Sequence, residues 1–462
     1  MFQRFTGLSR VHFVGIGGAG MSGIAEVLLQ QFDFTVTGSD RSLSETTERL
    51  AGLGVEIHRG HAAENVEGAD LVVISSAIPA DNVELVAARR QGITVVGRAE
   101  MLAELMRLKY GVAVAGTHGK TTTTSLIGTV LTETGLDPTV IVGGRLRVSG
   151  TGARLGASEL MVVEADEFDR SFLHLAPIIA VITSIDEDHL DTYGDLAEIQ
   201  SAFVAFARRV PFFGRVVVCL DDPNIQLILP RLADRRLLTY GLSPQADLSA
   251  SEVEARPWGS RFKVTAAGEG VLGTLEIPMP GTHNVVNALA AVAVGRTLDL
   301  GFEAIGDALA SFGGVHRRFE NLGSWHGAAV VDDYAHHPTE VAAALRAARQ
   351  VVGGGRVHAV FQPHLYSRTE ALAEDFGRAL LAADRALVTD VYGSREAPVE
   401  GVTGELVVDA ARASGHRQVR YCRDWRDAPE QLSEGIAEGD MVITLGAGDV
   451  YRLGQLLVEE GS

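Results

Sequence analysis

Short apolar runs alternate with longer amphipathic segments along most of the chain. The runs at residues 11–14, 112–115 and 178–183 are rich in valine, isoleucine and alanine and end in glycine or polar residues, which predicts buried parallel strands. The segments 21–31 and 120–131 repeat apolar residues at helical spacing. Because alternating strands and helices form parallel sheets covered by helices, the pattern predicts an α/β protein.

The length of 462 residues favours about three domains. We expect a Rossmann-like domain over residues 1–108, a central P-loop domain over 109–314 and a second Rossmann-like domain over 315–462. Residues 248–280 alternate with period two and contain glycine and proline, which predicts a small antiparallel β subdomain within the central domain.

Composition and charge narrow the function classes. With 40 basic and 59 acidic residues the net charge is −19, so the overall field disfavours nucleic acid and anionic membranes as partners. The first residues show no signal-peptide pattern, and no apolar run is long enough to cross a bilayer. The two cysteines, Cys219 and Cys422, form no metal or redox motif. We therefore expect a cytoplasmic protein without membrane insertion; monomer and homodimer both remain open.

The most informative stretch is GVAVAGTHGKTTTTSLIG, residues 111–128. A strand runs into a glycine loop, and Lys120 begins the next helix, so backbone N–H groups and the helix dipole favour an anion there. Lys120 adds a positive charge for a phosphate, and Thr121 adds a hydroxyl for Mg²⁺. Val114 stands where the standard P-loop has its first glycine. The sequence thus predicts a phosphate-binding loop over Gly116, Thr117, His118, Gly119, Lys120, Thr121 and Thr122; ATP as its ligand is implied only by the family resemblance given below.

Acidic residues follow two predicted strands of the central domain. The strand 160–163 leads into EADEFD, and a carboxylate at that position beside a P-loop is a candidate Mg²⁺ ligand. We favour Glu164, which we expect directly after the strand, and expect at least two of the four acids to be solvated. His189 lies in the cluster DEDHLD after the next strand and is a candidate metal ligand or phosphate contact.

A second glycine turn lies near the N-terminus. Gly15, Gly17 and Gly20 fit the spacing GxGxxG between a strand and a helix, with Asp40 about twenty residues further on. The turn alone favours an NAD(P)-dependent oxidoreductase, but the same geometry binds any pyrophosphate. That alternative leaves the phosphate loop and Glu164 unexplained. A nucleotide-regulated binding protein that uses the phosphate loop as a switch is a further alternative.

Polar segments also follow the predicted strands of the last domain. They are DDYAHHP (332–338), QPHLYSR (362–368), DVYGSRE (390–396) and GAGD (446–449). Because ligands bind at the carboxyl ends of parallel strands, these segments predict the ligand-facing edge of the third domain.

Taken together, these motifs resemble the Mur ligases, the ATP-dependent amide ligases of peptidoglycan precursor synthesis. The resemblance covers nearly the whole chain and rests on GIGGAGMSGIAEVL (15–28), SSAIPADN (75–82), AGTHGKTTTT (115–124), VVEADEFD (162–169), IDEDHLDTYGD (185–195), GTHNVVNALAA (281–291), RRFE (317–320), DDYAHHPTE (332–340), the segment 362–369 and SREAP (394–398). Other Mur ligases carry a carbamylated lysine after the DHLD-type stretch. Residues 200–206 contain no lysine, consistent with the alanine-adding branch.

The resemblance implies binding roles. UDP would be held by the first turn and the segment after the third apolar run, namely Gly15, Gly17, Gly18, Ala19, Gly20, Ser75 and Ser76. Asn284 or Asn287 would contact adenine, and Arg317 or Arg318 would contact phosphate or the ribose side. Mg²⁺ (or Mn²⁺) would be bound by Thr121, Glu164 and His189. The incoming L-alanine would be bound by Tyr334, His336 and Arg368, whereas Leu365 stands where some members carry an arginine.

The resemblance also implies the reaction. ATP would phosphorylate the lactyl carboxylate of UDP-N-acetylmuramate, and the amine of L-alanine would displace phosphate from the acyl phosphate, with Lys120 neutralising charge. His336 is a candidate base for the amine, and Asp332 or Asp333 is an equal alternative. The related ligase that adds a whole tripeptide is the remaining alternative within the family; DHLDTYGD and RRFE favour the single-amino-acid enzyme.

Overall fold

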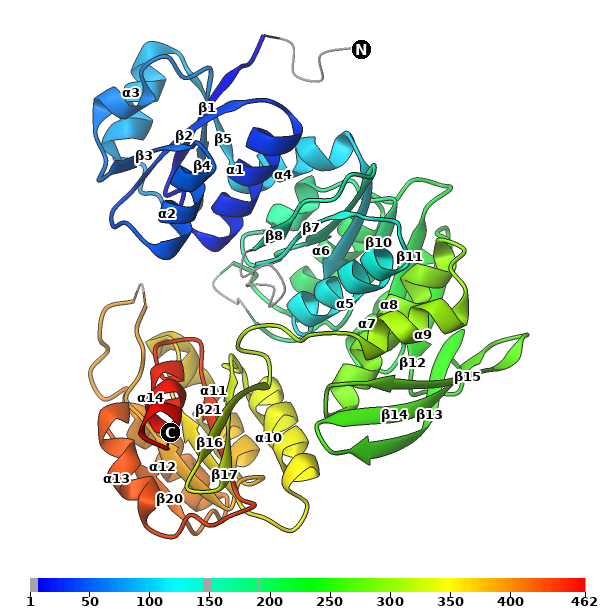
Figure 1. Ribbon diagram of the computed structural model, residues 1–462, viewed down its shortest axis with the longest axis vertical. Helices are drawn as coiled ribbons and strands as arrows, with labels where there is room; N and C mark the ends of the chain where they lie inside the picture. The colour runs from blue at the N-terminus through cyan, green and yellow to red at the C-terminus, as the bar shows by residue number, and fades with distance from the viewer. Residues whose placement is uncertain (1–6, 144–151, 189–191, 395, 462) are drawn as a thin grey trace. The chain divides into compact units, whose positions relative to one another are not determined.

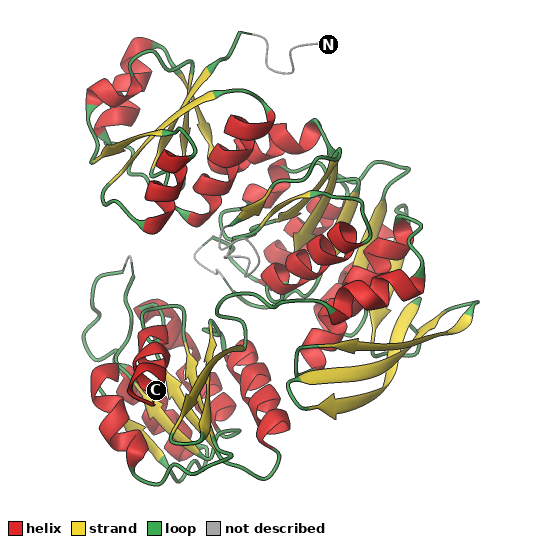
Figure 2. Ribbon diagram, in the orientation of Figure 1, coloured by secondary structure: helices red, strands yellow, loops and turns green. Residues whose placement is uncertain are grey.

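The computed structural model describes residues 7–143, 152–188, 192–394 and 396–461 and contains three β-sheets (Figures 1 and 2). The chain forms two compact units. The first comprises residues 1–251, 263–275 and 286–313, and the second comprises residues 252–262, 276–285 and 314–462. The predicted α/β class is confirmed, whereas the exact domain boundaries stay a prediction.

The first sheet has five parallel strands in the order β3-β2-β1-β4-β5. They are β1 (Arg10–Val14), β2 (Thr35–Asp40), β3 (Glu56–Arg59), β4 (Leu71–Ile74) and β5 (Thr94–Gly97). The helices are α1 (Ala19–Gln31), α2 (Glu45–Gly52), α3 (Val83–Gln91) and α4 (Arg98–Arg107), with the 3₁₀ turn η1 (Ala63–Val66). The strand order reverses at β1, so ligands are expected at the carboxyl ends of β1 and β4.

The second sheet has the order β15-β14-β13-β12-β11-β10-β6-β9-β7-β8. Its strands are β6 (Tyr110–Ala115), β7 (Thr139–Ile141), β8 (Ala153–Arg154), β9 (Leu160–Glu164), β10 (Ile179–Ile182), β11 (Arg215–Cys219), β12 (Leu237–Gly241), β13 (Leu248–Arg256), β14 (Gly259–Ala266) and β15 (Gly270–Ile277). The strands β11, β10, β6 and β9 are parallel neighbours, and residues 112–115 of β6 are fully buried. The phosphate loop therefore follows a central strand.

Helices of this part of the chain are α5 (Lys120–Glu133), α6 (Leu196–Ala207), α7 (Pro223–Ile228), α8 (Thr282–Thr297) and α9 (Phe302–Ala310), with the 3₁₀ turns η2 (Ser171–His174) and η3 (Leu229–Leu232). One detail differs from the sequence prediction. Glu164 is the last residue of β9 and not the first residue after it, because its backbone still pairs with Val114.

The third sheet has the order β16-β17-β21-β18-β19-β20, and only its edge strand β16 is antiparallel to its neighbour. Its strands are β16 (Glu320–Trp325), β17 (Ala328–Asp333), β18 (Val357–Phe361), β19 (Arg385–Val388), β20 (Val419–Tyr421) and β21 (Met441–Leu445). Its helices are α10 (Pro338–Val352), α11 (Tyr366–Leu380), α12 (Gly404–Ala413), α13 (Ala428–Ser433) and α14 (Tyr451–Gly461), with the 3₁₀ turn η4 (Trp425–Asp427).

Both faces of the third sheet are apolar. Alternate residues of β21, such as Ile443 and Val442, belong to different core clusters. The cluster with Ile443 includes side chains from α10, α11 and α12, and the cluster with Val442 includes side chains from α13 and α14. The polar strand ends predicted as a ligand edge therefore lie at the rim of a sheet that is covered on both faces (Figure 2).

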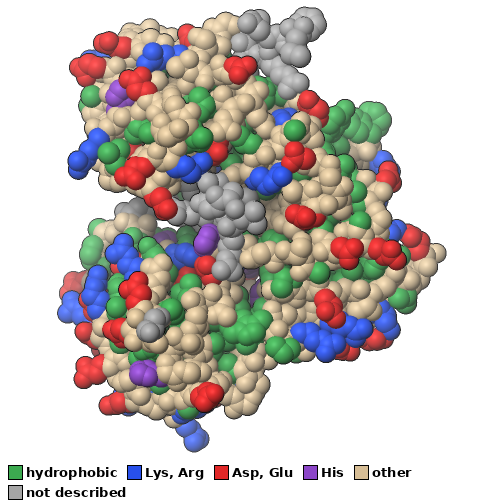
Figure 3. Space-filling view, viewed as in Figure 1, with side chains coloured by type: hydrophobic (Ala, Val, Ile, Leu, Met, Phe, Trp, Pro, Cys, Tyr) green, Lys and Arg blue, Asp and Glu red, His purple; other side chains and the backbone are tan. Residues whose placement is uncertain are grey.

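Charged side chains of both signs are interspersed over the face seen in Figure 3, without a field of one sign. Among the helices of the described residues, none is long and apolar enough to span a bilayer.

Candidate functional site

The loop after β6 depends on two glycines with positive φ. Gly116 has φ 139°, and a Cβ there would lie 2.0 Å from the Thr183 hydroxyl oxygen. Gly119 has φ 80° and directly precedes α5, and a Cβ there would lie 2.7 Å from Oδ1 of Asn287. Side chains are excluded at both positions by backbone conformation and by contact. The predicted strand–loop–helix arrangement is therefore confirmed, and anion binding at this loop stays a prediction.

The end of β10 fixes the loop by hydrogen bonds. The N–H groups of Thr117 and His118 donate to Ser184, at 3.0 Å to its carbonyl oxygen and 2.9 Å to its hydroxyl oxygen. Thr183 Oγ1 donates to the carbonyl of His118 at 2.5 Å, and the Asp186 N–H donates to Thr117 Oγ1 at 2.9 Å. His118 Nε2 and Asp186 Oδ2 are hydrogen bonded at 3.0 Å. His118 is therefore held against the β10 loop, which fits a loop-shaping role.

The side chain of Lys120 folds back onto the loop that precedes it. Its Nζ donates to the carbonyl oxygens of Gly116 and Thr117 at 2.7 and 3.2 Å and to Glu167 Oε1 at 2.8 Å. Burial opposes the charge on Lys120, but Glu167 and Asp166 outweigh it and raise the pKa of the ammonium. Burial raises the pKa of Glu167 to about 7, against the pull of Lys120. The ammonium is thus held charged and aimed at the loop.

Glu167 is a residue that sequence reasoning missed. Its side chain is only 3% exposed, so it is not one of the solvated acids expected in EADEFD. The sequence shows four acids in six positions but does not show which of them turns inward. The one signal in the sequence was Lys120, because an ammonium buried in the loop needs an acid as its counter-charge.

Glu164 and Thr121 form a pair of oxygen donors beside the loop. Thr121 Oγ1 donates to Glu164 Oε1 at 2.9 Å, and the Gly143 N–H donates to Glu164 Oε2 at 2.8 Å. Hydroxyl and carboxylate oxygens are the ligands that Mg²⁺ prefers, so these two residues fit the predicted metal site. His189, the third predicted ligand, lies outside the described residues.

The two candidate adenine contacts differ in their surroundings. Asn287 Oδ1 accepts a hydrogen bond from Thr123 Oγ1 at 3.2 Å, which ties it to the first turns of α5. Asn284 Nδ2 donates to the carbonyl of Pro280 at 2.8 Å within the second compact unit. Asn287 thus lies beside the phosphate loop.

The N-terminal glycine turn is fixed by the end of β2. The N–H groups of Gly15 and Ile16 both donate to the Ser39 carbonyl, at 2.8 and 3.0 Å, and the Gly17 N–H donates to Asp40 Oδ2 at 2.9 Å. Gly15 has φ 79°, and Gly18 at the tip is exposed. The Asp40 carboxylate is therefore hydrogen bonded to the turn itself. In a dinucleotide-binding enzyme, an acid at this position would instead hydrogen bond to the ribose.

The other members of this predicted site lie around the same edge. Ala19 and Gly20 open α1, and a Cβ at Gly20 would lie 2.7 Å from Nη1 of Arg98. Ser75 and Ser76 follow β4, which is the parallel neighbour of β1, so they share the edge with the turn. The structure thus brings together all the residues predicted for UDP.

A buried carboxylate lies behind this turn and was not predicted. Glu84 is fully buried and accepts hydrogen bonds from Ser39 Oγ at 2.7 Å, Asn65 Nδ2 at 2.6 Å and His61 Nδ1 at 2.8 Å. Burial alone would raise its pKa, but the hydrogen bonds from these residues and from His12 lower it to about 2. Ser39 thus connects an ionised, buried glutamate to the backbone that holds the turn.

In the second unit, aromatic and imidazole rings line the carboxyl edge of the third sheet. Tyr334 and His336 are 5.2 Å apart edge to face, and His336 Nδ1 lies 3.0 Å from the Tyr334 carbonyl oxygen. His364 lies 5.7 Å from His336 and stacks on Tyr392 at 6.0 Å. Sequence reasoning did not single out His364 or Tyr392. Both lie in segments predicted to face the ligand.

The amino end of α11 completes this edge. Arg368 lies in the first turn of the helix, and Leu365 precedes the helix with φ 69° and is buried. Leu365 therefore packs inward and offers no cation at this position.

The two adjacent arginines have different surroundings. Arg317 donates to Asp332 Oδ2 at 3.0 Å and to the Gly446 carbonyl at 2.6 Å, and it lies 4.6 Å from the ring centroid of Tyr451. It thus connects β17 to the segment after β21.

Burial raises the pKa of Asp333 to about 6, with Arg318 as the opposing charge. Burial also raises the pKa of Asp332.

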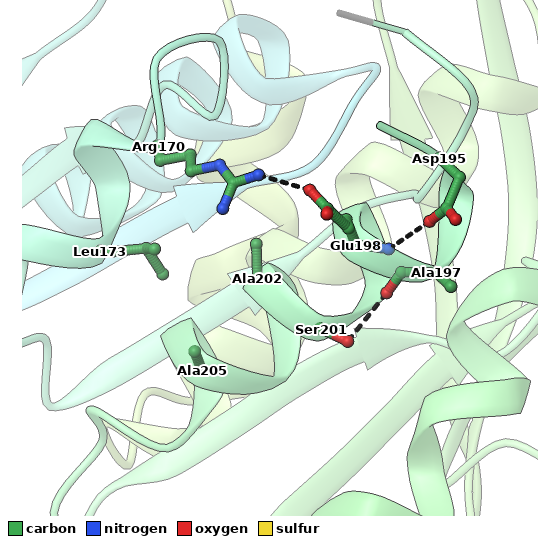
Figure 4. Close-up of a pocket in the computed structure, with 8 residues that line it drawn as sticks. All are labelled: Arg170, Leu173, Asp195, Ala197, Glu198, Ser201, Ala202 and Ala205. Atoms are coloured by element: carbon green, nitrogen blue, oxygen red, sulfur yellow. Dashed lines mark hydrogen bonds and ion pairs between the residues drawn. The ribbon is translucent and has the colours of Figure 1, made fainter. Parts of the chain in front are cut away.

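A hollow of about 440 Å³ lies behind the acidic loop (Figure 4). It is lined by residues of η2 and α6 and their flanks: Arg170, Leu173, Asp195, Ala197, Glu198, Ser201, Ala202 and Ala205. Arg170 pairs with Glu198 at 2.6 Å and lies 4.8 Å from the ring centroid of Tyr193, whose hydroxyl donates to the Glu167 carbonyl at 2.6 Å. These contacts support the loop that carries Glu167.

Comparison with known proteins agrees with this geometry over the whole chain. Three family models match in succession: "Mur ligase family, catalytic domain" over residues 10–110, "Mur ligase middle domain" over 114–295 and "Mur ligase, glutamate ligase domain" over 317–448. The UDP-N-acetylmuramate–L-alanine ligase of Salinibacter ruber is 53% identical over 453 residues, which cover 98% of this chain and 95% of the relative.

Solved structures show the same relationship. The UDP-N-acetylmuramate–alanine ligase of Thermotoga maritima has a TM-score of 0.82 at 30% identity and covers 98% of both chains. A murein peptide ligase of Psychrobacter arcticus also covers 98% of both chains, with a TM-score of 0.69 at 24% identity, and so shares the fold.

Proposed function

Because the chain belongs to the Mur ligase family, we propose that it is an ATP-dependent ligase that joins L-alanine to UDP-N-acetylmuramate. The products are UDP-N-acetylmuramoyl-L-alanine, ADP and phosphate, and the pathway is the synthesis of peptidoglycan precursors. The relative at 53% identity over 98% of this chain bears the name of this activity, whereas the solved ligase named for L-alanyl-γ-D-glutamyl-meso-diaminopimelate is 29% identical over 67% of this chain. This difference favours the single-amino-acid reaction over the tripeptide-adding one.

The phosphate loop is the observation that carries the proposal. A carboxylate does not condense with an amine in water, because its oxygen is a poor leaving group. ATP solves this by converting the carboxylate to an acyl phosphate. In our proposal Lys120 and the N–H groups of Gly116–Thr122 bind the phosphates and neutralise charge as the phosphoryl group moves. An oxidoreductase has no use for this lysine or for the carboxylates beside it.

Mg²⁺ or Mn²⁺ would be bound by Thr121 and Glu164, with His189 as a further ligand. When bound, the ion supplies positive charge to the triphosphate and to the oxygens of the transferred group. Support comes from the donor set: a hydroxyl and a carboxylate oxygen 2.9 Å apart next to the loop. Glu167 keeps Lys120 charged and in position before the nucleotide arrives.

The two other substrates would bind at the edges already described. The glycine turn after β1 and the serines after β4 would hold UDP, and the exposed tip at Gly18 supports access by a ligand. Tyr334, His336 and Arg368 would bind L-alanine, with Arg368 on its carboxylate. His336 and Asp333 are both candidates for the base, since burial raises the pKa of Asp333 to about 6.

The proposal is tested with the purified chain, ATP, Mg²⁺, UDP-N-acetylmuramate and L-alanine. We expect a new amide in the mass spectrum of the nucleotide product and one phosphate released per amide. UDP-N-acetylglucosamine is the matched control, because it has no lactyl carboxylate and should release no phosphate. Hydroxylamine in place of alanine should trap the acyl phosphate as a hydroxamate.

Replacing L-alanine by L-Ala-γ-D-Glu-meso-diaminopimelate separates the two family activities. Turnover with the tripeptide alone would assign the chain to the recycling reaction. ATP binding without any substrate-dependent phosphate release would support the switch-protein alternative. Binding of NAD(P) without binding of the UDP-sugar would support the oxidoreductase.

We also propose a cytoplasmic location, in line with the absence of a membrane-spanning helix among the described residues. Monomer and homodimer both remain open and are distinguished by light scattering of the purified protein.

A further inference from the structure

The turn between α6 and β11 carries two phenylalanines at its tip. The Gly214 N–H donates to the Pro211 carbonyl at 2.9 Å, so Phe212 and Phe213 occupy the two central positions of the turn. Glycine, asparagine, aspartate and serine are the usual residues there. Phe212 is 87% exposed and Phe213 is 54% exposed. Nothing in the turn's own geometry requires an aromatic side chain, so this choice calls for another explanation.

A third aromatic side chain lies at the same edge of the sheet. Tyr110, the first residue of β6, is 60% exposed. The register aligns Arg215 with Ile179 and Ile179 with Val112, so the start of β11, which follows the turn, and the start of β6 lie at the same edge of the sheet, two strands apart or about 10 Å. In the part of the chain that the structure describes, three of the four exposed aromatic side chains are these, and Tyr392 is the fourth.

The turn is held in place and does not depend on packing of the phenylalanines. Arg236 Nη1 donates to the Phe213 carbonyl at 3.0 Å, and Arg235 Nη1 donates to the Val210 carbonyl at 3.1 Å. A Cβ at Gly214 would lie 2.3 Å from the Ile178 carbonyl oxygen, so the backbone passes closely over β10. The two rings contact each other at 5.3 Å, edge to face, and point outward from a rigid support.

Positive charge surrounds the turn in a strongly acidic chain. Residues 208–215 and 231–236 contain six arginines and one aspartate, whereas the whole chain has a net charge of −19. The one aspartate, Asp234, pairs with Arg235 at 3.4 Å. Glu159, whose carbonyl accepts the Tyr110 N–H, is the exposed acid on the other side of this edge. The edge thus combines protruding aromatics with a local excess of arginine.

We propose that this aromatic edge, defined by Tyr110, Phe212, Phe213 and the arginines of 208–215 and 231–236, binds the surface of an anionic phospholipid bilayer. Phenylalanine at a protruding tip can enter the boundary between headgroups and acyl chains, and arginines beside it attract lipid phosphates. Phe212 is 87% exposed, so a protein partner would need a cavity to receive it, whereas a bilayer can receive it without a preformed cavity. The bilayer is therefore the occupant that the geometry favours.

The proposed contact leaves the phosphate loop accessible. Tyr110 begins β6 and Gly116 follows its other end, so the two lie at opposite edges of the same sheet, about 20 Å apart. The negative charge of the rest of the chain repels an anionic surface, so only the aromatic edge faces it. The contact is independent of the ligase reaction, and its failure would leave the proposed function untouched.

The test is co-sedimentation of the full-length chain with vesicles of phosphatidylcholine alone and of phosphatidylcholine mixed equally with phosphatidylglycerol. We expect binding to the anionic vesicles that falls in high salt, because the arginine contribution is screened. The double variant Phe212→Ser/Phe213→Ser should lower the partition coefficient about tenfold or more, since both apolar groups are lost. Arg209→Gln should lower it less and reduce the salt dependence.

Leu227→Ser is the matched control, because Leu227 is 66% exposed on α7 but lies outside the aromatic edge. It should bind vesicles as the unmodified chain does. Each variant is also assayed for turnover in solution, which should be unchanged and which shows that the variant is folded. Absence of binding to anionic vesicles, or equal binding by the double serine variant, would overturn the proposal. Concentration-dependent self-association that the double variant abolishes, without vesicle binding, would instead assign the edge to a second copy of the chain.

Discussion

The two glycine loops of the first compact unit share one backbone arrangement but differ in the charged side chain that contacts them. Each follows a buried parallel strand and opens a helix, and each is braced by the end of the neighbouring strand. The turn at Gly15–Gly20 receives a carboxylate, since Asp40 accepts the Gly17 N–H. The loop at Gly116–Gly119 receives an ammonium, since Lys120 folds back onto its carbonyl oxygens.

This difference in charge separates binding from chemistry. A pyrophosphate that is only to be held needs N–H donors and a helix terminus. A phosphoryl group that is to be transferred also needs positive charge placed where negative charge develops in the transition state. In our proposal Lys120 supplies it, together with the metal ion that Thr121 and Glu164 would bind. The comparison therefore points to Lys120, the residue after the last glycine, as the difference to test.

The largest expected effect follows from removing that side chain. Lys120→Ala should lower kcat for amide formation by about a thousandfold or more, because the charge on the transferred phosphoryl group loses its main protein counter-charge. The Kd of UDP-N-acetylmuramate, measured by calorimetry, should change less than about twofold, since the first turn is separate. Equal loss of both would show that the two loops do not have separate roles.

Glu164→Gln tests the second component of the same loop. The amide keeps the shape but removes the charge from the donor pair with Thr121, so the Mg²⁺ concentration for half-maximal rate should rise about tenfold or more. The measurement is a Mg²⁺ titration of phosphate release at saturating substrates. An unchanged titration curve would remove Glu164 from the metal site, and UDP-sugar binding serves as the internal control for folding.

Much of this picture could be predicted from the sequence. The strand–loop–helix units were recognisable because a run such as Val112–Ala115 is apolar throughout and ends in glycine, a purely local signal. The class of fold and the residues of both loops followed from it. The strands β3 and β8 were not singled out, because β3 (EIHR) contains no apolar run and β8 has only two residues.

The inward acids could not be predicted in the same way. Glu167 lies in the acidic segment EADEFD and Glu84 lies between Val83 and Leu85, and each is buried where partners distant in the chain converge on it. Lys120 is 47 residues from Glu167, and Ser39 is 45 residues from Glu84. Such pairings depend on tertiary packing, which a single sequence does not display.

A smaller effect is expected at the first turn. In Gly17→Ala the new Cβ would lie 2.8 Å from Asp40 Oδ2, so the Asp40 carboxylate that accepts the Gly17 N–H must move. The KM for UDP-N-acetylmuramate should therefore rise about tenfold. The KM for ATP should stay unchanged. Gly52→Ala, on α2 and outside the predicted UDP site, is the matched control, because its Cβ would meet nothing within 4 Å. If both variants behave alike, close contact at Gly17 does not set substrate binding.

The smallest effect on turnover is expected from Glu84→Gln, which acts on stability. Hydrogen bonds hold the pKa of Glu84 at about 2, against an ordinary value of 4.5, so the ionised form stabilises the folded state. That difference corresponds to roughly 3 kcal/mol at neutral pH. The contribution is complete above pH 4.5 and disappears as the pH falls towards 2, because the carboxylate is then protonated in the folded state as well.

Thermal unfolding of Glu84→Gln and the unmodified chain should therefore differ clearly at pH 7 and progressively less below pH 4.5. Glu64→Gln, an exposed change on the neighbouring η1, should match the unmodified chain throughout. A stability difference that is the same at pH 7 and pH 3 would mean that packing of the side chain, and not its charge, supports Ser39 and the turn. In the phosphate loop, Thr183 and Ser184 contribute hydroxyl and carbonyl groups that do not titrate, whereas Asp186 pairs with His118. Acid should thus weaken the first loop through Glu84 while leaving the bracing of the second by β10 hydroxyls unchanged.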